Sequence, residues 1–236
     1  MGAAGLLAWL WTPWALLLIL VPLDLMLWAT LAPGCEWWGP VLRSFGSRYR
    51  EVLLTFDGAP HPDETPEVLV LLERYEARAL FMVDALRAER HPELVKEIVS
   101  RGHGIGCALT DEEAAQFWRT GPQQLDAAIQ RNRETLKHIV PDAALQWLRV
   151  PGEIKMPWLH LVLSRHGLKL ISASADDGGL VMRNMERALL RMRSAIGKGC
   201  VIQFHHNQRD ASGHGTMPEM LEEMLIWLRG QGYGMS

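Results

Sequence analysis

The sequence predicts an α/β domain built on parallel strands, preceded by a long hydrophobic segment. From Glu51 onward, short apolar runs alternate with longer amphipathic stretches, a pattern typical of strand and helix units around a parallel sheet. Upstream, residues 3–32 contain a single ionisable side chain. The expected organisation is a hydrophobic membrane anchor over 1–33, a linker over 34–49 and one globular domain over 50–236.

Six apolar runs are expected to form the strands of the sheet. Runs of this length, rich in Val, Ile, Leu and Phe, are typical of strands buried on both faces. Six strands with intervening helices are compatible with an open doubly wound sheet or with a barrel, and the local pattern does not choose between them. The runs are Val52–Phe56, Ala79–Val83, Gly104–Cys107, Leu145–Val150, Lys169–Ala173 and Cys200–Phe204.

Helices are expected between these strands. The first is predicted to begin with Thr65 as its N-cap and Pro66 at the first helical position, where the missing N–H of proline is tolerated. Three later helices each show an apolar stripe at a spacing of three or four residues, which indicates a buried face. The stripes are Leu125, Ile129, Leu136 and Ile139; Met185, Leu189, Met192 and Ile196; and Leu221, Met224, Leu225 and Leu228.

Composition excludes some classes of protein. The chain has 236 residues and a net charge of −3, and no basic stripe suggests a nucleic-acid partner. Its three cysteines, Cys35, Cys107 and Cys200, are odd in number and widely spaced, so neither a disulfide framework nor a thiolate metal site is predicted.

The hydrophobic segment is predicted to be a single-pass membrane anchor. About 20 apolar residues span the hydrocarbon layer as a helix, and tryptophans such as Trp9, Trp28 and Trp37 favour the membrane interface. A cleaved signal peptide is the alternative, but no Lys or Arg precedes the apolar run. The pattern leaves the side of the membrane open.

Polar residues that follow the predicted strands are the candidate site. In parallel α/β folds, ligands bind at the carboxyl ends of the strands. A carboxylate, a guanidinium and an imidazole at one end of a sheet could serve as base, orienting cation and acid in a hydrolysis. The candidates are Asp57, the segments 107–110 and 174–177, Arg149, His205 and His206.

Several stretches resemble the polysaccharide deacetylase family, also called the NodB homology domain or carbohydrate esterase family four. Thr55-Phe56-Asp57-Gly58-Ala59-Pro60 is similar to its T-F-D-D-G-P motif, and Leu148-Arg149-Val150-Pro151 resembles F-R-x-P. Three more stretches carry the likeness: 78–81 (R-A-x-F), 91–106 (H-P-E-L-V, then R-G-H-x-I-G) and 199–206 (G-x-I-I-L-L-H-D). The fold that this resemblance implies is a distorted (β/α) barrel.

The resemblance also implies a site. Asp57 takes the position of the general base, Arg149 that of the residue orienting the base, and His205 that of the general acid. Pro60 and Pro151, which shape the loops, and His206 are expected at the substrate-binding surface. Active members are expected to hold a divalent metal, usually zinc, with a second Asp and two His. Those three positions are Gly58, Ala108 and Glu112 here, so no metal and no other cofactor is predicted.

Three functions are compatible with this pattern. In the first, a membrane-anchored relative of the deacetylases, a pseudoenzyme of cell-envelope carbohydrate metabolism, binds a glycan or scaffolds a partner without metal-dependent deacetylation. In the second, a working hydrolase removes N-acetyl groups from amino-sugar polymers through a rebuilt site around Asp57, Arg149 and His205. Such a site could recruit zinc through Glu112, His206 or Cys107. In the third, the barrel is a purely structural membrane protein.

Overall fold

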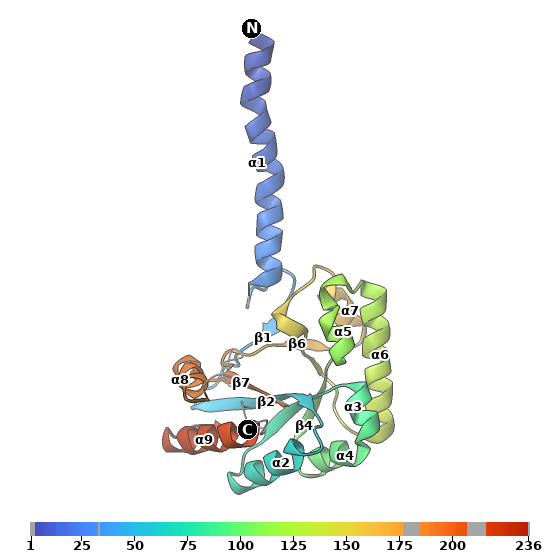
Figure 1. The fold of residues 1–236 in the computed structure, drawn as a ribbon, viewed down its shortest axis with the longest axis vertical. Helices are drawn as coiled ribbons and strands as arrows, with labels where there is room; N and C mark the ends of the chain where they lie inside the picture. Colours follow the sequence, from blue (N-terminus) through green and yellow to red (C-terminus); the bar gives the residue numbers. More distant parts are fainter. Residues whose placement is uncertain (1–2, 33, 177–184, 207–215, 236) are drawn as a thin grey trace.

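The computed structural model describes residues 3–32, 34–176, 185–206 and 216–235, with the side chains of the first helix described from Leu16 onward. Asp177, one of the polar candidates of the sequence, lies outside the described residues. The described part is a curled sheet surrounded by helices, from which one long helix, α1 (Ala3–Leu31), projects (Figure 1).

The sheet is parallel throughout and has the strand order β1-β6-β5-β4-β3-β2-β7, with β8 paired to β2. β2 is the longest strand and pairs with β3, β7 and β8. The strands are β1 (Val41–Leu42), β2 (Glu51–Ala59), β3 (Ala79–Val83), β4 (Gly104–Cys107), β5 (Trp147–Leu148), β6 (Lys169–Ile171), β7 (Cys200–His205) and β8 (Gly234–Met235).

The two edges of the sheet, at β1 and β7, approach each other. The sheet is therefore curled as in a barrel and is not open. Ser44 forms an antiparallel bridge with Cys200, and Ala175 forms a parallel bridge with Ile202. The curl encloses a small inner core of Leu80, Met82, Ile171 and Val201. The architecture is therefore the curled (β/α) barrel that the sequence resemblance implied.

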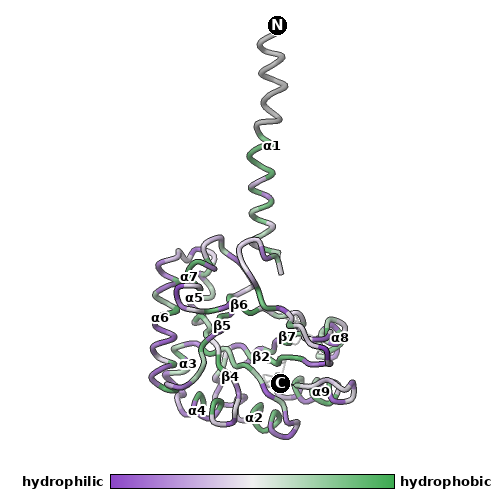
Figure 2. Tube along the Cα trace, turned by 180° about the vertical axis from the view of Figure 1, so that it is seen from behind, coloured by the Kyte–Doolittle hydropathy of each residue, from purple (hydrophilic) through white to green (hydrophobic). Residues whose placement is uncertain are grey.

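Helices lie around the outer face of the sheet (Figure 2). Apolar side chains of the helices and strands form the main core there. On that face Phe56 stacks on Phe81 and on Phe204, with ring centroids 4.9 and 5.3 Å apart, so three neighbouring strands share one aromatic layer. After α1, the helices are α2 (Glu64–Arg74), α3 (Ala85–Arg90), α4 (Pro92–Ser100), α5 (Asp111–Ala115), α6 (Pro122–Ile139), α7 (Leu159–Arg165), α8 (Met185–Ala195) and α9 (Met217–Gly230).

All six predicted strands are present, and the structure corrects several predicted boundaries. The strand predicted over Leu145–Val150 contains only two residues, β5. Residues 34–49, expected to be a linker, contribute β1, which pairs with β6, so the sheet begins before residue 50. α2 begins at Glu64 with Asp63 as N-cap, so the predicted cap at Thr65 was wrong. The Thr65 hydroxyl instead accepts a hydrogen bond from His61 N at 2.8 Å.

Helix α1 is attached to the barrel at its C-terminal end. Lys155 N donates to Thr30 O at 3.0 Å, and Lys155 Nζ donates to Ala32 O. Lys155 is buried, and burial lowers the pKa of its ammonium group. Among the residues that the structure describes, no helix has the length and apolarity needed to cross a membrane. The predicted anchor stays a prediction.

Candidate functional site

Asp57 lies near the carboxyl end of β2, beside His205 on β7. The two residues are register partners in the parallel pair, so the fold brings the predicted base and acid together. Directly after Asp57 the pairing of β2 with β3 shifts, and Gly58 adopts φ +76°. Residues with a Cβ atom rarely adopt positive φ. Because glycine has none, it adopts the backbone conformation of this irregularity at little cost.

Arg149 is the ionic partner of Asp57. Its Nη1 lies 2.7 Å from Asp57 Oδ1, and the two side chains are only 6% and 19% exposed. Arg149 N donates to Cys107 O at 3.3 Å, which places the arginine beside the end of β4. The structure therefore pairs Asp57 with Arg149, and their roles as base and orienting cation stay predictions.

Gln203 joins Asp57 to His205. Its Nε2 lies 2.7 Å from Asp57 Oδ2 and 2.8 Å from His205 Nε2. The amide nitrogen must face the carboxylate, because an amide oxygen there would meet a second acceptor. Since that nitrogen only donates, His205 Nε2 accepts and carries no proton in this arrangement. The predicted general acid is thus held in its proton-accepting form.

His206 lies beneath the cleft, with both ring nitrogens engaged. Nδ1 is 3.1 Å from Asp57 O, and Nε2 is 3.2 Å from Thr65 Oγ1. The ring packs edge-on against Phe56, and burial lowers the pKa of His206 to about 3. These contacts fix the end of β2 and leave little of the ring for the predicted substrate contact.

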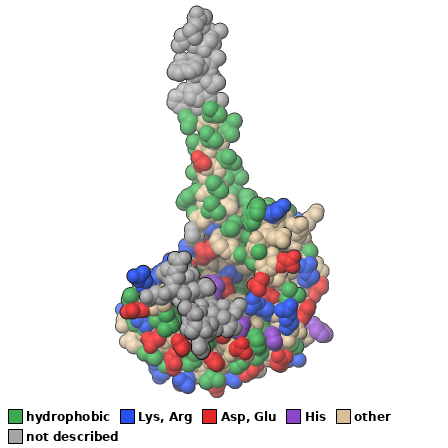
Figure 3. All heavy atoms as spheres, viewed as in Figure 1, with side chains coloured by type: hydrophobic (Ala, Val, Ile, Leu, Met, Phe, Trp, Pro, Cys, Tyr) green, Lys and Arg blue, Asp and Glu red, His purple; other side chains and the backbone are tan. Residues whose placement is uncertain are grey.

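A cleft of about 820 Å³ opens above this network. Acidic, basic and histidine side chains gather around a hollow on this face of the molecule, below α1 (Figure 3). Pro151 lines the cleft, whereas Pro60, which follows a cis peptide bond, lines an adjoining groove. Of the predicted site residues, Asp57, Arg149, Pro151, His205 and His206 share one cleft and Pro60 lies beside it.

A family model described as polysaccharide deacetylase matches residues 47–171, just over half of the 236-residue chain. The chain belongs to the polysaccharide deacetylase family. A chitooligosaccharide deacetylase of Bradyrhizobium is 27% identical over 171 residues, which cover 70% of this chain and 75% of that protein.

Solved structures share the fold of this family member at low identity. A family 4 carbohydrate esterase pseudoenzyme from Bacillus anthracis superposes with a TM-score of 0.71 at 16% identity, covering 83% of this chain and 66% of that one. The peptidoglycan deacetylase PdaC from Bacillus subtilis superposes with a TM-score of 0.68 at 20% identity, covering 81% and 89%.

The residues present do not fit the metal that the family resemblance implies. Gly58 and Ala108 bring no donor side chain, and Ala108 lines the cleft while Glu112 does not. In the described part of the chain, no group of three His, Cys, Asp or Glu side chains is arranged to hold a metal ion. Cys107, considered for a rebuilt site, is buried, and burial raises its thiol pKa to about 12.

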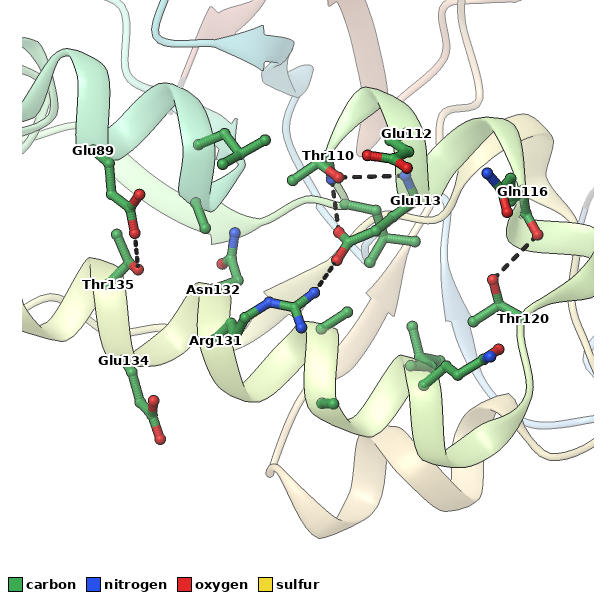
Figure 4. A pocket seen from close by; sticks show the side chains of 17 residues that line it. Glu89, Thr110, Glu112, Glu113, Gln116, Thr120, Arg131, Asn132, Glu134 and Thr135 are labelled. Atoms are coloured by element: carbon green, nitrogen blue, oxygen red, sulfur yellow. Dashed lines mark hydrogen bonds and ion pairs between the residues drawn. The ribbon is translucent and has the colours of Figure 1, made fainter.

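Glu112 instead lines a separate pocket of about 710 Å³ between α3, α5 and α6 (Figure 4). The first turn of α5 is fixed by a reciprocal cap in which the Thr110 side chain accepts from Glu113 N and the Glu113 side chain accepts from Thr110 N. Arg131 on α6 lies 2.5 Å from the same Glu113 carboxylate. Glu112 also lines the groove that adjoins the cleft of Asp57, although it does not line the cleft itself.

Sequence reasoning missed three residues of this family member's site. Gln203 is two positions before His205 on a strand, so side-chain alternation could have placed both on one face. Asp84 and Arg87 follow β3, at the same end of the sheet as Asp57. Burial raises the pKa of Asp84, whose carboxylate accepts from Arg87 N at 3.0 Å. The position of the pair directly after a strand was the available signal.

Proposed function

We propose that this chain is a membrane-anchored, glycan-binding member of the polysaccharide deacetylase family that does not perform metal-dependent deacetylation. The observation that carries the proposal is the Gln203 amide, which bonds both Asp57 and His205. The predicted base, Asp57, and the predicted acid, His205, are thus both hydrogen-bonded to the neutral side chain of Gln203. A reaction that uses Asp57 Oδ2 and His205 Nε2 would have to break both contacts first.

The cleft nevertheless suits a carbohydrate. It is lined by carboxylates, guanidinium groups and imidazoles, which exchange hydrogen bonds with sugar hydroxyls and amides. The Bradyrhizobium relative is named for chitooligosaccharides and the Bacillus subtilis structure for peptidoglycan. An oligomer of N-acetylglucosamine is therefore the ligand class to test.

The test is calorimetric titration of the full chain, purified in a mild detergent, with a tetramer of N-acetylglucosamine. Binding is expected, and His205→Ala in the cleft should weaken it by about tenfold or more. Glu134→Ala in the separate pocket of Figure 4 is the matched control and should bind as the unsubstituted chain does. Absence of binding in the unsubstituted chain would refute the glycan-binding function.

Acetate release from the same oligomer decides between binding and hydrolysis. We expect none above the rate without protein, with or without added zinc. Release of acetate that zinc stimulates and a chelator abolishes would establish instead the second function, a working hydrolase with a rebuilt site.

Membrane anchoring is proposed from α1. This helix runs from Ala3 to Leu31, and its described apolar side chains, such as Leu18 and Ile19, are largely exposed. A long exposed apolar surface favours burial in lipid. Resistance of the membrane-bound chain to carbonate extraction is the measurement. Leu17→Arg with Leu20→Arg should release the protein, whereas Leu161→Arg on the exposed surface of α7 should not.

A further inference from the structure

Arg87 is a cation at the rim of the cleft that the predicted chemistry does not use. It lies on α3, directly after β3, and its side chain is 21% exposed. Its Nη1 donates to Gly58 O at 2.8 Å. Its Nε lies 3.0 Å from Asp84 Oδ2, and its Nη2 lies 2.8 Å from Asp111 Oδ2. One guanidinium therefore bonds a carbonyl near the end of β2 and two carboxylates that follow β3 and β4.

Two of these three segments, the end of β2 and the stretch after β4, are where the family resemblance places the missing metal ligands. A Cβ atom built on Gly58 lies 3.5 Å from Arg87 Nη1, so a carboxylate at position 58 would emerge against the guanidinium. Ala108 lines the cleft together with Arg87, and Glu112 lines the adjoining groove together with Arg87. Arg87 therefore contacts position 58 and shares a cleft or groove with positions 108 and 112.

We infer that the Arg87 guanidinium is the resident cation beside Gly58, in the part of the cleft where the metal ligands are missing, and excludes a divalent metal from it. A guanidinium stays charged at every physiological pH. Asp84 and Asp111 supply its counter-charge, and both carboxylates would otherwise attract a cation. This inference rests on the proposed function, in which metal-dependent deacetylation is absent. It adds a physical cause for that absence, the positive charge of Arg87.

The competing explanation is that Arg87 has a purely structural role, because its contacts also connect three segments of the chain. Charge and shape can be separated by substitution. Arg87→Lys keeps the positive charge but loses the planar fork, whereas Arg87→Met keeps much of the volume and loses the charge. If the charge of Arg87 excludes metal, Arg87→Met should bind metal and Arg87→Lys should not. If Arg87 only connects the three segments, the two variants should bind metal equally.

The first experiment restores the three ligands in the full chain by Gly58→Asp, Ala108→His and Glu112→His. Zinc binding is measured by calorimetry and elemental analysis with Arg87 unchanged, with Arg87→Lys and with Arg87→Met, each checked for the same thermal unfolding midpoint. We expect about one zinc ion per chain with Arg87→Met and at least about 100-fold weaker binding in the other two. Equal binding in all three, or none with Arg87→Met, would overturn the inference.

A second experiment needs no rebuilt ligands and decides the matter if the multiple variant does not fold. Arg87→Met alone leaves Asp84, Asp111 and the Gly58 carbonyl without their cation, and such oxygen donors suit Mn²⁺. Calorimetry should show Mn²⁺ binding at least about tenfold tighter than in the unsubstituted chain, and adding Asp84→Asn should remove the gain. Unchanged Mn²⁺ affinity would overturn the inference.

The two proposals fail in distinguishable ways. Tight zinc binding by the unsubstituted chain, together with acetate release, would refute the proposed function. Absence of zinc from the unsubstituted chain and also from the Arg87→Met variants would refute only the role of Arg87.

Discussion

Arg149 Nη1 lies 2.7 Å from Asp57 Oδ1, although 92 residues separate the two in the chain. Arg149 comes from the segment after β5, and Asp57 comes from β2. Both charges are largely withdrawn from water, so each depends on the other. Four predictions follow from this pair, from Gly58, from a buried histidine and from the cysteines.

Asp57→Asn should lower the free energy of unfolding by about 2–3 kcal/mol, because it leaves a buried guanidinium without its counter-charge. Adding Arg149→Met should cost less than the sum of the two single changes, since the double variant buries no unpaired charge. Urea unfolding measures both. The exposed pair of Arg74 and Glu222 is the control, and Glu222→Gln should cost under about 1 kcal/mol. Additive single effects at Asp57 and Arg149 would contradict the coupling.

Gly58→Ala should lower the free energy of unfolding by about 1 kcal/mol, because an alanine at φ +76° is strained. The nearest atom to the new Cβ is 3.5 Å away, so the effect comes from the backbone and not from a clash. Gly58→Asn should cost less, since asparagine tolerates the left-handed region. Gly46→Ala, in open space, is the control in thermal unfolding. Equal losses for alanine and asparagine would count against this explanation.

His103→Leu should make the protein less sensitive to acid. Burial lowers the pKa of His103 to about 4, below the ordinary value of 6.5. Between these values the unfolded chain binds a proton that the folded chain does not, so stability falls as the pH drops from 6.5 to 4. The contribution is at most about 1.4 kcal/mol per pH unit.

Urea unfolding of both proteins between pH 8 and pH 4.5 tests this effect. The difference between His103→Leu and the native chain at pH 8 is the reference, because His103 is then neutral in both the folded and the unfolded chain. A difference that stays constant down to pH 4.5 would show that His103 does not contribute.

One thiol of three should react in the folded protein. Cys107 and Cys200 are buried, whereas Cys35 is partly exposed. Burial also raises the pKa of Cys107 to about 12, so little thiolate forms there at neutral pH. Titration with a chromogenic disulfide should give about one equivalent, and Cys35→Ser should remove it. Two or more fast equivalents would show that the buried thiols are accessible.

Local sequence was a good guide to the strands and a poorer guide to their ends. Ala79–Val83 and Gly104–Cys107 form strands with the predicted bounds. The first is a continuous apolar run between Arg78 and Asp84, and the second begins directly after His103. β1 escaped notice because it has two residues and is stabilised by pairing with β6. Such a strand depends on its neighbour more than on its own composition.

The sequence predicted several residues of the site but not the hydrogen bonds and ion pairs that connect them. Asp57, Arg149 and His205 were found because they stand in motifs of a known family. Gln203 stands where that motif has a leucine and Arg87 stands in no motif, so only strand alternation and the position after a strand could have marked them. Their importance depends on distances to Asp57 and Gly58 that arise only when β2, β3 and β7 lie side by side.

The sequence by itself determined the α/β class, the six central strands, the family and the substitution of all three expected metal ligands, because apolar periodicity and short motifs are local properties. Only the tertiary structure decided that the sheet curls into a barrel, that Gln203 bonds both Asp57 and His205, and that the Arg87 guanidinium lies against Gly58. The physical reason is that hydrogen bonds and ion pairs act over about 3 Å in space, whatever the separation along the chain.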